Sequence, residues 1–361
     1  MLALPFKKAE RGTDLVGPLR KYIVKEFSKE DAARYDSDLE SLQRMRSAAV
    51  SVEACSPAGR EALERYHTEL RRLETLFPVS ETEVKVSFRW HDAFSTSKKS
   101  AQSTLHFERV CVLYNVAALE SSAGADADRS GEAGLKEACT RFQLAAGIVQ
   151  HIRDHLSAGL FGALTQDLTP DGLNACCAMM LAQAQKCFYE KACMDRPRTK
   201  LKANIIAKLA AQAIDFYRQA LGIMNGPNLA PSLDRTWPGH VEFQALAFEG
   251  YTAYWESQAV HEAAEAKGEG YGLEIARLVQ AEASLDAAMK VANRYSLNAS
   301  FTSYASSMRA TIAKAKTSAV KDNDSIYLEP VPNPANLPAV ARASMVKPLL
   351  PPLLQVNRVH R

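Results

Sequence analysis

The sequence predicts a mostly α-helical protein, an irregular tetratricopeptide-like helical solenoid with a small β-sheet near its N-terminus. Three observations predict this fold. Apolar residues recur at helical spacing through most of the 361 residues, alternation with a period of two occurs only in the first hundred, and small residues face large ones in successive Ala-rich helices. No strict repeat is present, so we expect successive helix pairs to differ.

Two segments of the N-terminal region alternate as β-strands do. Leu2, Leu4 and Phe6 point one way, and apolar and polar residues alternate from Val84 to Trp90. Such alternation indicates a half-buried strand. Because two or three strands cannot form a domain, we expect a small sheet that packs against helices.

Helical periodicity covers nearly all of the remaining chain. Ser56 and Thr169 are predicted N-caps because each stands directly before a proline at a first helical position. A helix that starts at Pro170 is expected to break at Pro197. The other expected helices are Lys21–Val52, Pro57–Phe77, Ser103–Ala123, Gly134–Leu156, Lys200–Leu221, His240–Ala266, Gly272–Tyr295 and Thr302–Val320.

The helical pattern ends at Asp322. The nineteen residues that start with Asp322, "DNDSIYLEPVPNPANLPAV", contain four prolines and have no period, so they are expected to run extended over the surface as a strap. Residues 346–361 form a Pro/Leu-rich tail that we interpret as a docking segment or a linker. We therefore predict one domain over residues 1–345, followed by this tail.

Composition excludes several classes of protein. The chain has 44 Lys and Arg against 41 Asp and Glu, a formal net charge of +3, which is too balanced to indicate a nucleic-acid partner. No apolar run approaches the roughly 18 residues of a membrane span, and no signal peptide is recognisable. The seven cysteines form no CxxC pair. Buried, reduced thiols in a cytoplasmic protein are the expected state.

No pattern of catalytic or metal-binding residues is complete. "HEAAE" (His261 to Glu265) resembles a zinc-protease motif but has Glu where the second His belongs, and two ligands do not make a metal site. Phosphate-binding loops, dinucleotide fingerprints and nucleophile elbows are absent from the sequence. We therefore expect a protein that is not an enzyme and needs no metal or cofactor.

The predicted helix Lys200–Leu221 carries two apolar stripes. On a helical wheel, Ile206, Ala210 and Tyr217 belong to a broad apolar face. Ile205 and Leu209 belong to a second, narrow stripe with a polar border. Either this helix is sandwiched between two neighbours, or the second stripe is partly exposed and forms the wall of a groove for an amphipathic partner helix.

Several separated segments resemble, in the same order, the Bro domain of the ALIX family of endosomal-sorting adaptors. The resemblance spreads over nearly the whole chain, and an ordered set is more specific than any single segment. The segments are "FRWHDAF", "FERVCVLYNVAALES", "MLAQAQKCFYEKA", "ANIIAKLAAQAIDFY", "GLEIARL" and "KDNDSIYLEPVP".

This resemblance implies a curved solenoid without catalytic activity, in the cytoplasm and recruited to endosomes. It also implies a groove for the C-terminal amphipathic helix of a Snf-type ESCRT-III subunit, in multivesicular-body sorting or membrane scission. The residues that would line the groove are Phe188, Ile205 and Leu209, with Met345 from the strap and with Glu132 and Lys136 at a polar rim. Under this resemblance the second stripe is the groove wall.

Other features depart from the family or leave a role open. The loop Ser95–Ser103 lacks the bulky apolar tip with which relatives contact lipid. Tyr327 matches a tyrosine that the family uses as a phosphorylation target, although it can equally be a buried strap residue. Two alternative functions remain: a Bro-domain scaffold in signalling or pH response, and a peripheral membrane or curvature-binding module. The second would make weak anionic-membrane contact through the basic run of Arg196, Arg198, Lys200 and Lys202.

Overall fold

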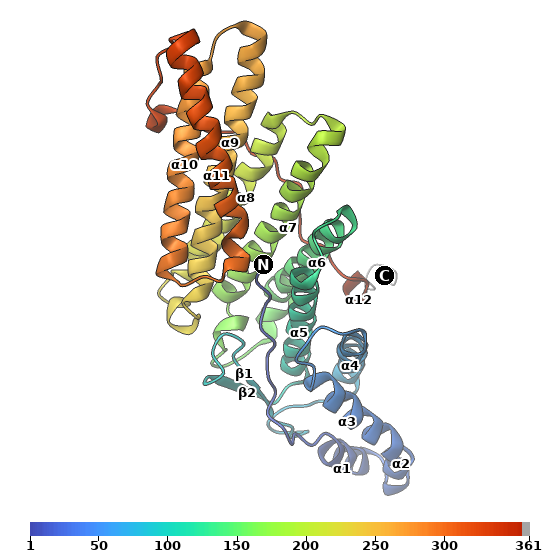
Figure 1. The fold of residues 1–361 in the computed structure, drawn as a ribbon. Coiled ribbons are helices and arrows are strands. Elements are labelled where there is room, and N and C mark those ends of the chain that lie inside the picture. Colours follow the sequence, from blue (N-terminus) through green and yellow to red (C-terminus); the bar gives the residue numbers. More distant parts are fainter. Residues whose placement is uncertain (356–361) are drawn as a thin grey trace.

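The computed structural model describes residues 1–355, and nearly all of its regular structure is helical. The part of the tail at residues 356–361 lies outside the described residues. The molecule is elongated, with α1 and α2 at one end and α9, α10 and α11 at the other (Figure 1). From α3 onward, each long helix packs mainly against the helices before and after it in the chain. This order brings the middle helices, α5 to α8, to the centre.

The long helices follow the predicted order, and most begin and end within a few residues of the predicted bounds. The small sheet lies between the fourth and fifth helices. The elements are α1 (Val16–Glu26), α2 (Lys29–Arg34), α3 (Asp36–Val50), α4 (Pro57–Leu76), β1 (Phe88–His91), β2 (Lys99–Gln102), α5 (Leu105–Asp126), α6 (Glu132–His151), α7 (Pro170–Thr199), α8 (Ala203–Met224), α9 (Thr236–Lys267), α10 (Tyr271–Arg294), α11 (Ala299–Asp322) and α12 (Pro352–Gln355).

The single helix expected over Lys21–Val52 is wrong, since three helices occupy this region. Ser28 is extended, and its side-chain oxygen accepts a hydrogen bond from the Asp31 backbone N–H, which starts a new helix. Tyr35 separates α2 from α3 with a backbone that is neither helical nor extended, at φ of −96° and ψ of 0°, and without a side-chain cap.

The sheet has two antiparallel strands, with Phe88 opposite Gln102 and His91 opposite Lys99. The expected alternation from Val84 to Trp90 is confirmed in burial, because its four apolar residues are buried and the residues between them are exposed. Only the end of that segment pairs as a strand. Its partner β2 comes from the segment Ser95–Ser103, which was expected to be a loop.

The helix α5 is central, as predicted, and it buries charged residues as well as apolar ones. The carboxylate of Glu108 accepts hydrogen bonds from Arg46 Nε at 2.8 Å, Trp90 Nε1 at 2.6 Å and Tyr66 Oη at 3.2 Å. Burial, together with this carboxylate, raises the pKa of Tyr66. Glu108 thus joins α3, α4 and β1 to α5.

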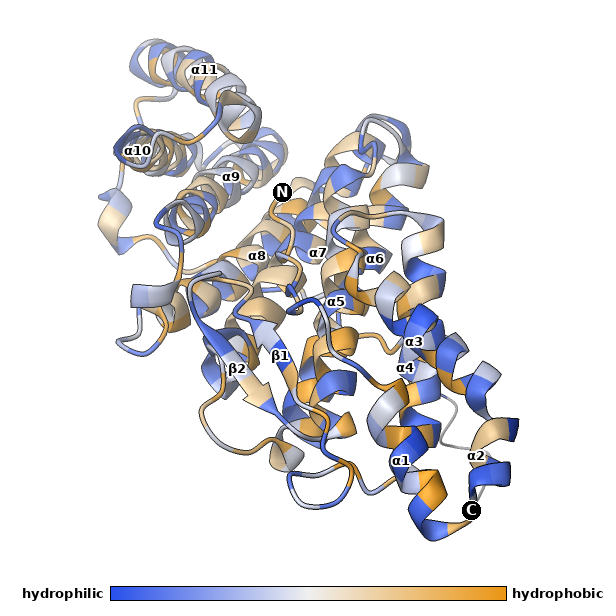
Figure 2. Cartoon of the chain, turned by 90° about the horizontal axis from the view of Figure 1, so that it is seen from below, coloured by the Kyte–Doolittle hydropathy of each residue, from blue (hydrophilic) through white to orange (hydrophobic). Residues whose placement is uncertain are grey.

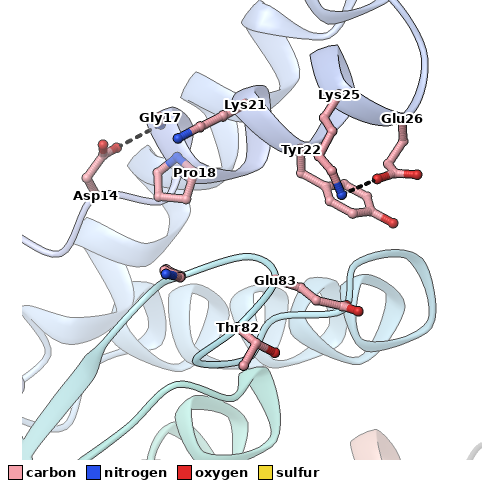
Figure 3. A pocket seen from close by; sticks show the side chains of 10 residues that line it. Asp14, Gly17, Pro18, Lys21, Tyr22, Lys25, Glu26, Thr82 and Glu83 are labelled. Carbon is pink, nitrogen blue, oxygen red and sulfur yellow. Dashed lines mark hydrogen bonds and ion pairs between the residues drawn. The ribbon is translucent and has the colours of Figure 1, made fainter.

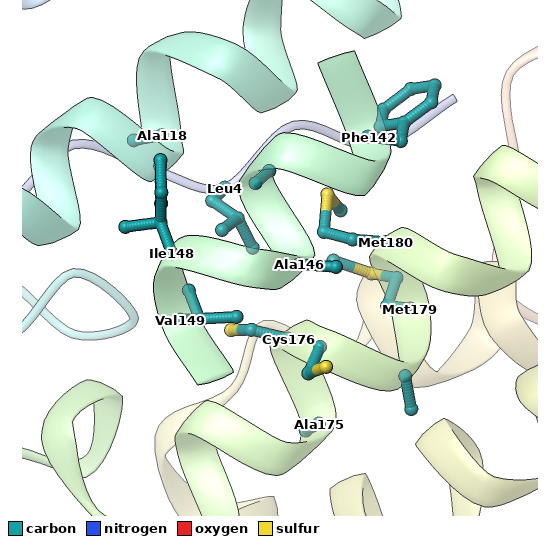
Figure 4. Close-up of a cluster of buried hydrophobic side chains, with 14 of the residues drawn as sticks. Leu4, Ala118, Phe142, Ala146, Ile148, Val149, Ala175, Cys176, Met179 and Met180 are labelled. Carbon is teal, nitrogen blue, oxygen red and sulfur yellow. The ribbon is translucent and has the colours of Figure 1, made fainter. Parts of the chain in front are cut away.

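Apolar side chains from α5, α6 and α7 interdigitate at the centre, where Leu4 of the N-terminal segment joins them (Figure 4). The apolar residues gather where the central helices and the sheet face one another (Figure 2). Among the cysteines, five are buried, Cys193 is half-buried and Cys55 is exposed, so the expectation of buried thiols fails for Cys55. Burial raises the pKa of Cys139 to about 11, which keeps it a thiol.

Pro197 does not break α7, contrary to prediction. The helix continues to Thr199 and ends at Lys200, whose backbone is left-handed with φ of 53°. Pro197 lies in the last turn, so only one intrahelical hydrogen bond is lost and little helix follows it. The short connection of residues 200–202 then makes α8 run antiparallel to α7.

The N-terminal segment is attached to the core by a buried ion pair. Lys7 Nζ lies 2.5 Å from Asp167 Oδ2 and 3.1 Å from Thr165 Oγ1, and neither charged side chain is exposed. Asp92 lies nearby, and burial followed by repulsion from Asp167 raises its pKa. The Lys7 ammonium group is therefore the buried cation beside two carboxyl groups, those of Asp167 and Asp92.

We expect Lys7→Met to lower the free energy of unfolding by about 3–5 kcal/mol, because it leaves a buried carboxylate without its partner. Lys8→Met is the matched control. Lys8 is 55% exposed and pairs with Glu53 at 3.5 Å, so its removal should change stability by less than about 1 kcal/mol. Urea denaturation of both variants measures the difference, and equal losses would contradict the assignment.

Candidate partner-binding site

The two apolar stripes of α8 meet different surroundings. Ile206, Ala210 and Tyr217 of the broad face are at most 1% exposed and form part of the core. Along the second stripe, Ile205 is 40% exposed whereas Leu209 is 6% exposed. The second stripe is thus divided. Leu209 is packed in the interior, whereas Ile205, one turn earlier, is open to solvent.

Gln185 fixes how α7 and α8 face each other at this stripe. Its side chain is fully buried, and Nε2 donates a hydrogen bond to the backbone oxygen of Leu209 at 3.1 Å. Phe188 follows Gln185 by about 4.5 Å along α7, and Ile205 precedes Leu209 by about 6 Å along α8. Because the helices are antiparallel, the half-buried Phe188 and the exposed Ile205 lie at nearly the same level of the pair.

The strap crosses both helices at the same place. Ala343 N–H donates to the backbone oxygen of Lys208 at 3.1 Å, and Gln185 Nε2 also donates to the oxygen of Ala343 at 2.9 Å. The N–H of Met345 donates to Gln185 Oε1 at 3.1 Å. The Met345 residue is 53% exposed. One amide therefore brings Met345 to the helix pair that carries Phe188 and Ile205.

Beyond Met345 the strap continues across α6. Lys347 N–H donates to Gln143 Oε1 at 3.1 Å, and Leu349 N–H donates to the Gln143 backbone oxygen at 2.9 Å. A Cβ atom on Gly147 would lie 1.9 Å from the Leu349 oxygen, so only glycine permits this crossing. The described part of the tail, residues 346–355, thus continues the strap and shows no break at residue 345.

The start of the strap is held on α10. The Glu329 carboxylate accepts hydrogen bonds from the backbone N–H groups of Gly270 at 2.9 Å and Gly272 at 2.8 Å. Arg277 Nη2 donates to the oxygen of Pro338 at 2.6 Å. The helical pattern does not end at Asp322 as expected, because Asn323–Tyr327 continues α11 as a π-helical turn, and Pro334–Asn336 forms a further short turn. The rest of the strap runs without regular structure and is fixed at α10, α8, α7 and α6 in turn.

Charged residues border the apolar surface at the end of α7. Glu132 Oε1 lies 2.9 Å from Lys191 Nζ, which also contacts Asp195 at 2.5 Å. Hydrogen bonds to these two carboxylates raise the pKa of Lys191. Lys136 is exposed, and it lies two turns before Gln143 on the same face of α6. The structure thus places Glu132 beside α7, and Lys136 on the face that the strap crosses.

Tyr327 lies near the start of the strap and packs against α10. Its ring stacks on Tyr271 with centroids 3.5 Å apart and planes inclined by 9°, and the residue is 39% exposed rather than buried. The hydrogen bond that the Tyr271 hydroxyl donates to Tyr327 favours the protonated phenol and is the main cause that raises the pKa of Tyr271 to about 12. Phosphorylation of Tyr327 stays a prediction.

Two of the four residues of the basic run at the end of α7 are paired. Arg196 contacts Glu262 at 2.6 Å and lies over the Trp255 ring at 5.0 Å, and Arg198 contacts Asp195 at 3.1 Å. Lys200 and Lys202 make no ion pair within residues 1–355. Two lysines attract an anionic surface weakly, at about 1 kcal/mol each, so this feature gives the membrane alternative little support.

The zinc-protease-like motif has a structural role. His261 Nδ1 lies 2.8 Å from the carboxylate of Glu274 on α10, and this contact joins α9 to α10. In the described part of the chain, no three His, Cys, Asp or Glu side chains are grouped to hold a metal ion. None of the helices within residues 1–355 is long and apolar enough to cross a membrane.

Sequence reasoning missed the residues that hold the strap, Gln143 and Gln185. A signal was present, since Gln183 and Gln185 interrupt an otherwise apolar run in α7. A buried amide requires hydrogen-bond partners. The sequence alone does not show that those partners come from a segment 158 residues further along the chain.

Residues 1–360 match a family model described as "BRO1-like domain". This chain belongs to the BRO1-like domain family. The "ALG-2 interacting protein X" of Dictyostelium discoideum is 29% identical over 99% of the chain, and the "Vacuolar protein-sorting protein bro1" of Aspergillus fumigatus is 33% identical over 96%. The chain spans 44% and 33%, respectively, of the lengths of these relatives. Names of other family members also refer to vacuolar sorting.

Solved structures share the fold of this BRO1-like domain. One described as "ALIX BRO1 CHMP4C complex" superposes with a TM-score of 0.82 at 31% identity, over 97% of this chain and 95% of that one. Another, of ALIX with a viral late-domain peptide, gives a TM-score of 0.84 at 30% identity over 99% of this chain and 50% of that one. This chain thus has the same fold as these solved structures.

We expect Gln185→Met to release the strap from α7, because it removes the amide that bonds Ala343 and Met345. The free energy of unfolding should fall by about 1–3 kcal/mol. Hydrogen exchange by mass spectrometry should show about tenfold faster exchange in peptides that contain residues 343–345. Gln219→Met, at an exposed position of α8, is the control. Unchanged exchange in Gln185→Met would show that the amide does not hold the strap.

Proposed function

We propose that this BRO1-like domain is a non-enzymatic adaptor that binds the C-terminal amphipathic helix of a Snf-type ESCRT-III subunit. The binding surface is the apolar cluster of Phe188, Ile205, Leu209 and Met345. The polar rim includes Glu132 and Lys136. In this proposal the domain acts in multivesicular-body sorting or membrane scission, as a cytoplasmic protein recruited to endosomes.

The observation that carries the proposal is the gathering of exposed apolar side chains around one buried amide. Ile205 and Met345 are 40% and 53% exposed, although they come from segments 140 residues apart. Gln185 bonds both Leu209 and Met345, and Phe188 follows Gln185 by one turn of α7, which supports grouping these residues in one surface. Exposed apolar surface bordered by charge is typical of a partner site. A surface formed where the strap crosses two adjacent helices suits the apolar face of an amphipathic helix.

The comparisons support the same partner class. The similar structure named as a complex contains CHMP4C, an ESCRT-III subunit, and the relatives include proteins named for vacuolar sorting. We also propose that the nearest-neighbour packing of the helices is an irregular tetratricopeptide-like solenoid, curved as in the ALIX family. Its successive helices would then present α6, α7 and α8 side by side to one partner helix.

We expect Ile205→Asp to weaken binding of an ESCRT-III C-terminal helix by about 30-fold or more, equivalent to about 2 kcal/mol. The carboxylate would be desolvated against the apolar face of the partner. Because Ile205 is exposed in the free protein, the melting temperature should stay near native. Peptide titration by calorimetry and thermal melting together measure the two effects.

Val279→Asp is the matched control, because Val279 is 37% exposed on the distant helix α10. It should leave both affinity and melting unchanged. Leu209→Asp is unsuitable as a first test: Leu209 is buried, so a charge there should destabilise the fold as well. Native affinity in a folded Ile205→Asp protein would place the partner elsewhere and refute the proposal.

A further inference from the structure

A second apolar hollow lies among α1, α3 and α4, away from the strap crossing. These helices belong to the end of the molecule that carries α1 and α2, whereas the strap crosses the central helices α6, α7 and α8 (Figure 1). Its volume is about 630 Å³. Apolar and aromatic side chains supply most of its lining. These are Tyr22, Ile23, Phe27, Tyr35, Leu39, Leu42, Met45, Leu73, Leu76 and Phe77.

Three large apolar side chains at this hollow are open to solvent. Phe27 is 72% exposed, Leu76 is 66% exposed and Tyr35 is 52% exposed. They come from the end of α1, the end of α4 and the junction of α2 with α3. Single exposed apolar residues are ordinary, but several that converge on one concave surface indicate an interaction site.

The apolar lining is specific to one side of α1. On the other side lies a hollow whose walls are polar, with Asp14, Lys21, Lys25 and Glu83 around it (Figure 3). Tyr22 lines both hollows, and its ring packs edge-to-face on Phe77 with centroids 5.8 Å apart. Incomplete packing of the N-terminal helices would leave apolar and polar gaps alike, so it does not explain this separation.

The charged groups of the apolar hollow are all acidic. Asp31, Asp38 and Glu69 contribute to its lining, and no Lys or Arg does so among the described residues. Arg34 contacts Asp31 at 3.3 Å and Arg72 contacts Glu69 at 2.9 Å.

Both arginines are largely exposed, at 77% for Arg34 and 69% for Arg72. Ion pairs of exposed side chains contribute about 0–1 kcal/mol, so an incoming cation can replace either arginine. The carboxylate of Asp38 makes no ion pair or hydrogen bond within residues 1–355. The hollow therefore offers carboxylates to a positively charged partner.

We propose that this hollow docks an amphipathic helix of a second protein partner, with Lys or Arg beside its apolar stripe. Walls formed by three helices suit a helical ligand whose large apolar side chains enter the hollow. The acidic residues attract its basic flank and disfavour an anionic membrane surface. The site is separate from the strap crossing on α6, α7 and α8, so this inference does not depend on the proposed function.

Two labelled synthetic helices with the same leucine stripe, one flanked by Lys and one by Glu, test this proposal by fluorescence anisotropy. The Lys-flanked helix should bind about tenfold or more tightly than the Glu-flanked one. The double variant Phe27→Ser/Leu76→Ser should lose about tenfold in affinity while its melting stays near native. Asp38→Lys should weaken binding of the Lys-flanked helix and strengthen binding of the Glu-flanked helix.

The control is Phe161→Ser, because Phe161 is 66% exposed, like Leu76, but lies on a loop outside the hollow. It should leave binding unchanged. Equal binding of the two helices, or an equal loss in the Phe161→Ser variant, would overturn the proposal. Analytical ultracentrifugation gives a further check. Self-association of the protein that the double variant Phe27→Ser/Leu76→Ser abolishes would also overturn the proposal, because a second copy of the chain would then occupy the hollow.

Discussion

The buried side-chain amides of α7 determine where the two extended ends of this domain lie. Gln183 exchanges two hydrogen bonds with the backbone of Leu2, at 2.6 and 2.8 Å, and thereby fixes the N-terminal segment. Gln185 bonds Leu209, Ala343 and Met345, and thereby fixes the strap against α8. Two residues span about 200° of a helix, so the amides project to opposite sides of α7.

This arrangement gives the candidate site a rigid base. Extended segments without their own secondary structure need partners for their backbone groups, and a buried amide that lost those partners would itself become unsatisfied. The strap and α7 therefore stabilise each other. As a consequence Met345 can remain exposed without being free to move away, and Leu209 can be buried directly beside the exposed Ile205. A preformed apolar surface lowers the conformational entropy lost when a partner helix binds.

Much of the helical order could be predicted because long helices with apolar faces have a clear period. The caps at Ser56 and Thr169 are confirmed, since both side chains accept the expected backbone hydrogen bonds. Two local features were not predicted from periodicity. Ser28 caps a new helix inside a region of continuous apolar spacing, and Pro197 is tolerated because it lies in the last turn of α7. The division of the second stripe of α8 into exposed Ile205 and buried Leu209 was not predictable from the stripe alone. It depends on Gln185 and the strap, which pack from elsewhere in the chain.

The central claim is that the strap and the pair α7 and α8 form one partner surface, and site-specific photo-cross-linking tests it most directly. A benzophenone amino acid would replace Met345 in one protein and Val279 in another, each mixed with the ESCRT-III C-terminal helix and irradiated. The account predicts cross-links from position 345, mapped by mass spectrometry to the apolar face of the peptide, and none from position 279. Absence of cross-links from position 345 while the peptide is bound, or equal yields from both positions, would contradict it.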